Sequence, residues 1–217
     1  MRIAVVDYGA GNLVSIGRAL ETVGATVTLA RDGAALVGAD ALVVPGVGAA
    51  GPAMVRLERH GLVEPIRGWV RSGRPYLGIC LGMQLLFDGS DEDGSTTLGL
   101  LPGRSVELRD APTLPHIGWN QVERRRDHPL LDGIPDGADC YFVHSYAVAP
   151  ADRSIVVAET AHGARFPSVI ASDAILGVQF HPERSGVDGL RLLANFVALV
   201  SARSAGDPAA AALAGGR

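Results

Sequence analysis

The chain has 217 residues, of which 47% are hydrophobic and 19% are charged, a composition typical of a folded globular protein rather than a disordered one. All 19 basic residues are arginine and the formal net charge is −4. These values exclude lysine Schiff-base and P-loop lysine chemistry, and they argue against the positive field that nucleic acid would require.

The apolar run in the N-terminal segment MRIAVVDYG is too short for a signal peptide, and no run in the chain is long enough for a membrane span. The two cysteines, Cys80 and Cys140, lie too far apart in sequence to form a CxxC metal site, and two thiols do not make a disulfide framework. We therefore expect a cytoplasmic protein that binds neither nucleic acid nor membrane and uses neither a metal ion nor a cofactor.

The first half of the chain alternates short apolar strands with helices of amphipathic periodicity. Strands are predicted over residues 2–7, 26–30, 41–44 and 75–79, and helices over residues 12–23 and 62–70. From residue 104 onward short β-branched runs predict strands over residues 105–108, 141–148, 154–159 and 175–180, some of them antiparallel. A closing helix is predicted over residues 186–201.

This order of elements predicts an α/β fold. Its central sheet is expected to be open, largely parallel and flanked by helices, with additional antiparallel strands. We expect one domain over residues 1–202 and a disordered tail over residues 203–217, where the sequence has no mixed polar and apolar pattern.

The segment PYLGICLGMQLLF joins a predicted strand to a helical run through Gly78, Cys80 and Gly82. Small residues two positions before and after a cysteine let the backbone fold back sharply, which is the pattern of a nucleophile elbow. Such a turn presents the thiol at the carboxyl end of the sheet, beside a helix N-terminus that favours the thiolate. The alternative is a buried structural cysteine between two tolerated glycines.

A thiol nucleophile requires a base, and the chain contains six histidines. His181 follows the apolar strand predicted over residues 175–180, and Glu183 stands two residues later. In an extended segment these two side chains point the same way, so Glu183 can accept from one ring nitrogen while the other faces the thiol. The spacing favours a Cys80–His181–Glu183 triad; for the pair alone, a loop histidine beside a surface glutamate is the alternative.

The motifs GICLGMQ, at residues 78–84, and GVQFHPE, at residues 177–183, resemble those of the class I (triad) glutamine amidotransferases. The segments DYGAGN, PGVG, HIGWN and YFVHSY are most similar to the glutaminase subunits of imidazole glycerol phosphate synthase, and the resemblance extends from residue 1 to about residue 201. It implies a flavodoxin-like fold. It also implies that Cys80 attacks the carboxamide of L-glutamine, that His181 moves the proton and Glu183 orients it, and that a γ-glutamyl thioester forms as ammonia leaves.

An oxyanion hole would need two backbone donors near the thiol. The N–H of Leu81 is placed correctly by the geometry of elbows in general. By resemblance the second donor comes from the PGVG turn, at Val47 or the adjacent Gly48.

Glutamine must also be held by its α-amino and α-carboxylate groups. Gln84, one helical turn after Cys80, fits by spacing. The resemblance implies these substrate-binding residues: Gly48, Gln84, Glu92, Ser145 and Tyr146. Glu92 lies in an acidic turn, and a merely solvated turn is the alternative. His144, in the YFVHSY motif, is expected to be structural or to position substrate rather than to act as the base.

By resemblance Asn12, Trp119, Tyr141 and Arg184 dock a cyclase subunit of imidazole glycerol phosphate synthase, a (β/α)8 barrel that forms a heterodimer with this chain and uses its ammonia. Trp, Tyr and Arg together are typical of interface hot spots. The alternative is that Trp119 and Tyr141 are core aromatics. Two other functions remain open: a stand-alone thiol hydrolase of similar fold, and a non-catalytic regulatory module, against which the intact triad argues.

Overall fold

In the computed structural model of the protein, the structure is described for residues 1–205. A nine-stranded sheet runs through the molecule in the order β2-β1-β3-β4-β12-β11-β10-β7-β8. Its strands are β1 (Arg2–Val6), β2 (Thr26–Ala30), β3 (Ala41–Gly46), β4 (Tyr76–Cys80), β7 (His116–Arg124), β8 (Ala138–His144), β10 (Val156–His162), β11 (Ala164–Ser172) and β12 (Ile175–Val178). The first five strands in the sheet order are parallel and the rest are antiparallel, which confirms the predicted fold class.

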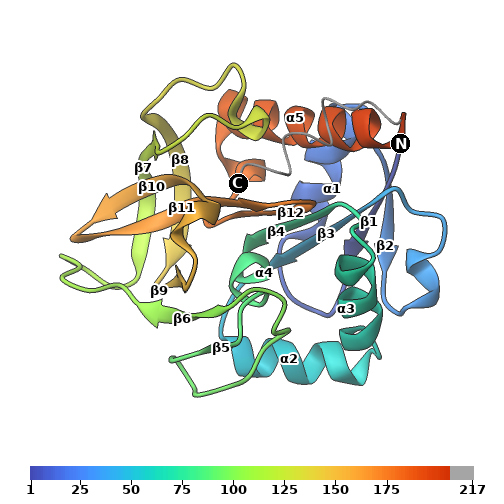
Figure 1. The fold of residues 1–217 in the computed structure, drawn as a ribbon, viewed down its shortest axis with the longest axis horizontal. Helices are drawn as coiled ribbons and strands as arrows, with labels where there is room; N and C mark the ends of the chain where they lie inside the picture. Colours follow the sequence, from blue (N-terminus) through green and yellow to red (C-terminus); the bar gives the residue numbers. More distant parts are fainter. Residues whose placement is uncertain (206–217) are drawn as a thin grey trace.

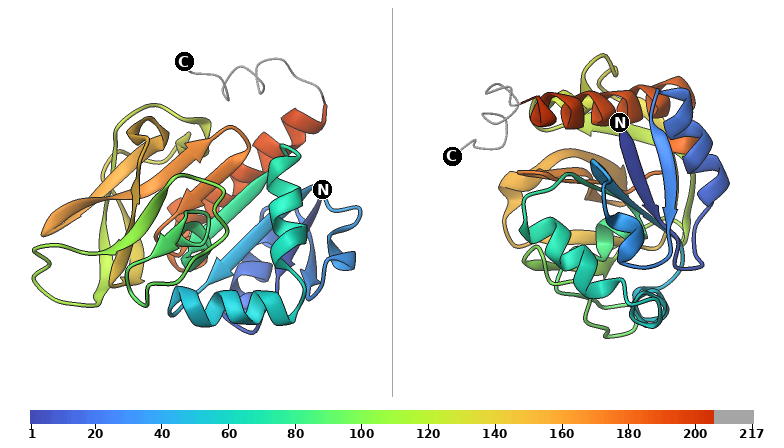
Figure 2. Two further views of the ribbon diagram at one scale, coloured as in Figure 1. Left: turned by 60° about the horizontal axis from the view of Figure 1, so that its bottom comes forward. Right: turned by 90° about the vertical axis from the view of Figure 1, so that its right-hand side faces the viewer.

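Helices cover both faces of the parallel half of the sheet (Figures 1 and 2). On one face lie α1 (Leu13–Thr22) and α5 (Gly186–Ser204); on the other lie α2 (Ala50–Arg59), α3 (Val63–Arg71) and the single turn α4 (Leu81–Gln84). The buried strand β1 contributes alternate residues to the two cores, with Ile3 and Val5 on the α1 and α5 side and Ala4 and Val6 on the other.

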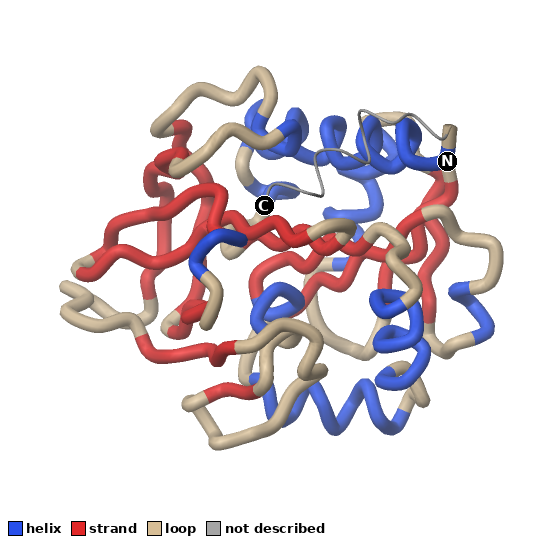
Figure 3. Tube along the Cα trace, in the orientation of Figure 1, coloured by secondary structure: helices blue, strands red, loops and turns tan. Residues whose placement is uncertain are grey.

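A smaller sheet lies beside the first and has the order β5-β6-β9, formed by β5 (Gly89–Ser90), β6 (Gly103–Glu107) and β9 (Tyr146–Pro150). Short 3₁₀ turns are η1 (Ala34–Leu36), η2 (Pro129–Leu131), η3 (Arg153–Ile155) and η4 (Pro182–Arg184). Figure 3 shows that strands and loops dominate the antiparallel half, whereas the helices gather around the parallel half.

Several predicted elements differ from the structure. The strand predicted over residues 141–148 is two strands, because the chain leaves β8 at Ser145 and β9 pairs with β6 in the smaller sheet. Helix α2 was not predicted, since Gly51 and Pro52 suggest a turn; proline is tolerated there because the first helical turn needs no partner for its N–H. The strand predicted from residue 154 begins as η3, and β7 and β11 were missed.

The closing helix is longer than predicted. Helix α5 continues to Ser204, so Arg203 and Ser204, which we expected in a disordered tail, are helical. The remainder of that expected tail, residues 206–217, lies outside the described residues. Over residues 1–205, none of the helices combines the length and the apolar character that crossing a bilayer would require.

Candidate active site

Strand β4 ends at Cys80 and α4 begins at the next residue, so the cysteine occupies the sharp turn predicted for an elbow. Its backbone has φ 54° and ψ −111°, a conformation that side-chain-bearing residues rarely adopt. A Cβ atom on Gly82 would overlap the carbonyl oxygen of Val44 in β3, and one on Gly78 would lie 2.6 Å from the carbonyl oxygen of Gly82. Both glycines are therefore required for the turn.

The pairing of β12 with β4 brings the predicted base to the elbow. The two strands are parallel, with Gly177 opposite Gly78, so the chain that follows β12 passes the thiol. His181 is buried and its Nδ1 lies 3.0 Å from Oε1 of Glu183, while its Nε2 has no hydrogen-bond partner among the described residues. The three predicted triad residues are thus brought together.

Electrostatics favours the protonated form of His181. Burial lowers the pKa of His181, but the neighbouring Cys80 thiol and the Glu183 carboxylate raise it by more, to about 10. His181 can therefore keep its proton at neutral pH and face the sulfur of Cys80 as an imidazolium.

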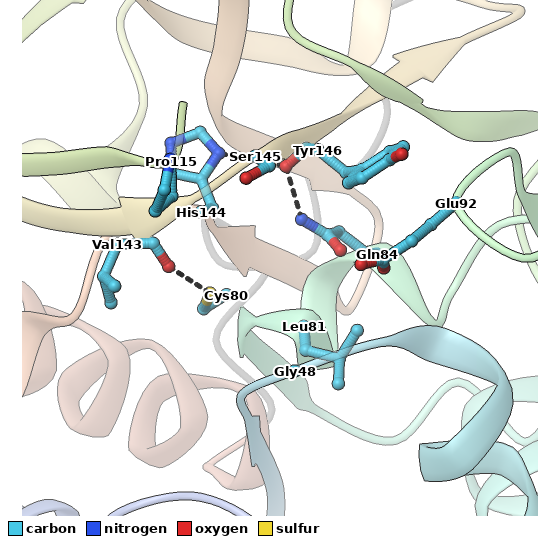
Figure 4. Close-up of a pocket in the computed structure, with 10 residues that line it drawn as sticks. All are labelled: Gly48, Cys80, Leu81, Gln84, Glu92, Pro115, Val143, His144, Ser145 and Tyr146. Atoms are coloured by element: carbon cyan, nitrogen blue, oxygen red, sulfur yellow. Dashed lines mark hydrogen bonds between the residues drawn. The ribbon is translucent and has the colours of Figure 1, made fainter. Parts of the chain in front are cut away.

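A cavity of about 180 Å³ opens in front of Cys80 (Figure 4). It is lined by Gly48, Cys80, Leu81, Gln84, Glu92, Pro115, Val143, His144, Ser145 and Tyr146. All the residues predicted to bind substrate are in this set. Sequence reasoning assigned no role to Pro115 or Val143, although each lies in or beside a motif that we had noted, and it left His144 between two roles.

The PGVG turn lies directly beside the nucleophile. Gly46, at the end of β3, pairs with Cys80, and Gly48 has φ +87° and lines the cavity. Leu81, at the start of α4, lines the cavity as well. Val47 does not line it, and its side chain is 43% exposed. The two predicted sources of oxyanion donors therefore both adjoin the thiol.

Gln84 is already engaged within the protein through its amide nitrogen. Its Nε2 donates to the carbonyl oxygen of Tyr146 at 2.7 Å and to Oε1 of Gln179 at 3.1 Å. Both N–H groups are used, so only the amide oxygen can meet a ligand, and an oxygen accepts hydrogen bonds. If glutamine binds here, Gln84 is therefore suited to its ammonium group. The exposed Glu92 also lines the cavity, where its carboxylate can meet a cation.

His144 is neutral and both of its ring nitrogens are already hydrogen-bonded, so neither is free to act as the base. Its Nδ1 donates to the carbonyl oxygen of Tyr146 at 2.9 Å, so its Nε2 must accept from Nδ1 of His116 at 3.1 Å. Burial lowers the pKa of His144 to about 3. Its role in the structure is to fix the backbone that forms the cavity wall.

Three of the residues predicted to dock a partner form one cluster of contacting side chains. Trp119 and Tyr141 face each other across β7 and β8, with ring centroids 6.2 Å apart, and the Arg184 guanidinium lies 3.9 Å from the centroid of the Tyr141 ring. Trp119 is 58% exposed, so the alternative of a core aromatic is wrong for it. Asn12 is also exposed and caps α1, which contacts η4.

No group of three histidine, cysteine, aspartate or glutamate side chains within residues 1–205 is arranged to hold a metal ion.

Comparison with known proteins gives one consistent family. The sequence profile of the family described as "Glutamine amidotransferase class-I" matches residues 4–200. "Imidazole glycerol phosphate synthase subunit HisH" of Symbiobacterium thermophilum is 50% identical over 200 residues, covering 92% of this chain and 94% of that protein. The protein of the same name from Aquifex aeolicus is 48% identical over 198 residues, covering 90% and 96%.

Solved structures share the fold at low sequence identity. A structure described as a glutamine amidotransferase aligns with a TM-score of 0.73 at 20% identity, covering 91% of this chain and 98% of that one. PurLQS from Thermotoga maritima aligns with a TM-score of 0.70 at 18% identity, covering 91% and 97%. These likenesses concern the fold alone.

Replacing the elbow glycine Gly82 by alanine should change the stability of the protein very differently from the same replacement at a helical glycine. Gly82→Ala should lower the free energy of unfolding by at least about 2 kcal/mol, because the new methyl group meets the backbone of β3. The control is Gly68→Ala in α3, which has open space around its Cβ position and should be stabilised by about 0.5–1 kcal/mol. Urea unfolding measures both; equal effects would contradict the packing argument.

Glu183→Gln should lower the pKa of His181, because it removes one of the two groups that raise it. In the parent, the proton on His181 stabilises the folded state. This contribution is fully present below pH 6.5, the ordinary pKa of histidine, and it is lost as the pH rises to about 10. Titration of the histidine ring signals by NMR measures the change. His128, whose pKa burial lowers to about 4, is the control and should not move.

Proposed function

Because the chain belongs to the class I glutamine amidotransferases, we propose that it is the glutaminase subunit of an imidazole glycerol phosphate synthase. The observation that carries this proposal is that an elbow cysteine lines one cavity together with all the residues expected to hold glutamine, and that a buried histidine–glutamate pair lies beside this cysteine. The substrate is L-glutamine and the products of this subunit are glutamate and ammonia.

The chemistry follows from the geometry of the triad. The Cys80 thiolate attacks the carboxamide carbon of glutamine, and the imidazolium of His181 gives its proton to the leaving nitrogen, so ammonia departs and a γ-glutamyl thioester remains. Neutral His181 then takes a proton from water, which attacks the thioester and releases glutamate and the thiolate. Glu183, bound to Nδ1, keeps Nε2 directed at the reacting atoms and stabilises the imidazolium.

The tetrahedral intermediates carry a negative oxygen that needs donors. The N–H of Leu81 at the elbow and an N–H of the turn at Val47 or Gly48 supply them. Supporting this assignment, the end of β3 pairs with the nucleophile, so both donor segments are adjacent to Cys80. The left-handed backbone at Gly48 is a conformation that glycine adopts without steric cost, so the turn can reorient its amides.

The name of the relatives denotes a subunit, so the chain has a partner subunit. We propose that this partner is a cyclase with a (β/α)8 barrel. It uses the ammonia to make imidazole glycerol phosphate and AICAR in histidine biosynthesis, and it docks on the face bearing Asn12, Trp119, Tyr141 and Arg184. In support, Trp119 packs edge-to-face on Tyr141 and Arg184 lies over the Tyr141 ring, which makes an aromatic and cationic surface of the kind that dominates interfaces. We place the assembly in the cytoplasm, where its two free thiols stay reduced.

Cys80→Ala should abolish glutamine hydrolysis while the fold is retained, with kcat falling by at least about 10³-fold, since the change removes the thiol that lines the cavity. The matched control is Cys140→Ala, which removes a buried thiol outside the cavity and should leave kcat nearly unchanged. Glutamate release measures both variants. Turnover by the Cys80 variant close to that of the parent would refute the proposed chemistry, and a comparable loss in the control would point to the wrong thiol.

Trp119→Ala should weaken binding of the cyclase subunit by about 2 kcal/mol or more, about 30-fold in Kd, because the indole is a large exposed anchor. The control is Val37→Ala, which truncates a side chain that is 83% exposed beyond η1, at the opposite end of the sheet. Titration calorimetry with the purified cyclase measures both. Full affinity in the Trp119 variant would place the docking surface elsewhere, and full glutaminase activity without any partner would favour the stand-alone hydrolase.

A further inference from the structure

Gln179 is a fully buried polar residue between β12 and His181, and its side chain reaches the nucleophile. Its Nε2 lies 3.5 Å from Sγ of Cys80, within hydrogen-bond distance for sulfur. Its backbone N–H donates to the carbonyl oxygen of Ser168 at 2.9 Å, which ties the residue to β11. Because the residue is fully buried, its side-chain amide must find partners within the protein.

The orientation of this amide follows from its neighbours. The carbonyl oxygen of Tyr146 can only accept, so the atom of Gln84 that contacts it must be the nitrogen. That same nitrogen contacts Gln179, whose facing atom must therefore be the oxygen. The nitrogen of Gln179 is then the atom directed at the sulfur of Cys80. One backbone carbonyl thus fixes the direction of the whole chain of hydrogen bonds.

The surroundings of the sulfur show why a donor matters there. The carbonyl oxygen of Val143 lies 4.0 Å from Sγ of Cys80 and can interact favourably only with the neutral thiol (Figure 4). A negative sulfur facing this oxygen is disfavoured, and its burial adds to the cost. An N–H on another side of the sulfur offsets both effects, since hydrogen bonds to charged acceptors are stronger than neutral ones.

We propose that Gln179 is a catalytic residue that donates its side-chain N–H to the Cys80 thiolate, and that Gln84 is the positioning residue that holds the amide in this orientation. The donated bond stabilises the negative sulfur before attack and fixes it between the cavity and His181. When the sulfur forms the thioester its charge is lost, so the bond acts on the free enzyme more than on the intermediate. This inference rests on the proposed role of Cys80 as the nucleophile.

The test is the pH dependence of alkylation of the full chain by iodoacetamide, with the two cysteines resolved by peptide mass spectrometry. Gln179→Met keeps the length of the side chain and removes its N–H groups. The midpoint pH for Cys80 alkylation should rise by about one unit, and the rate below the midpoint should fall about tenfold. Gln121→Met, at an exposed position of β7, is the matched control and should match the parent. An unchanged midpoint in the Gln179 variant would overturn the proposal.

Cys140 reports on folding in the same experiment, because burial raises its pKa to about 12 and it should stay unreactive in every folded variant. If Gln179→Met exposes Cys140, Gln179→Leu decides instead: it is also uncharged and also lacks the N–H donor, so it adds no charge beside the sulfur. A higher midpoint then supports the proposal and an unchanged one overturns it. Glutamine turnover by Cys80→Ala would refute the proposed function while leaving a shifted midpoint intact, so the two failures are distinguishable.

Discussion

The left-handed backbone of Cys80 is the constraint on which the rest of the site depends. It is imposed from both sides, because β4 pairs with β3 and with β12 and neither neighbour can move away without breaking a parallel ladder. The turn is tight enough that Gly82 packs against the carbonyl of Val44 with no room for a side chain. The strain of one residue is thus held by the pairing of three strands, and the thiol, the end of β3 and the start of α4 keep fixed positions relative to one another.

Two buried histidines near the thiol are held in opposite protonation states by their surroundings. His181 faces a carboxylate and a thiol, which raise its pKa, whereas His144 is buried against a carbonyl and another imidazole, and its pKa is lowered. Burial acts in the same direction on both residues, so the difference comes from the neighbours. Of the two, His181 is the one that can donate a proton at neutral pH. His144 instead holds the cavity wall in place through its hydrogen bond to the carbonyl oxygen of Tyr146.

The parts of the site that the sequence could predict are those whose geometry is local. The glycines around Cys80 and the two-residue spacing of His181 and Glu183 each encode one turn, and the structure has both arrangements. Pro115 and Val143 were not predicted as cavity residues, because strand pairing between distant segments brings them there and residue spacing does not show such pairing. Strands β7 and β11 were not predicted because Gly118 and Pro167 are residue types that usually interrupt strands. The surrounding sheet accommodates both of them, and this too depends on pairing with distant segments.

The pairing of β12 with β4 also has a consequence for how the molecule is made. Gln179 and Cys80 are 99 positions apart, so the thiol is synthesised long before the segment that carries His181 and Gln179. Contacts of such long sequence separation are slow to form because the intervening chain must first be closed into a loop. A chain synthesised only as far as β4 contains Cys80 but not yet His181, Glu183 or Gln179. The candidate site is therefore completed only when β12, the last parallel strand in chain order, is inserted beside β4.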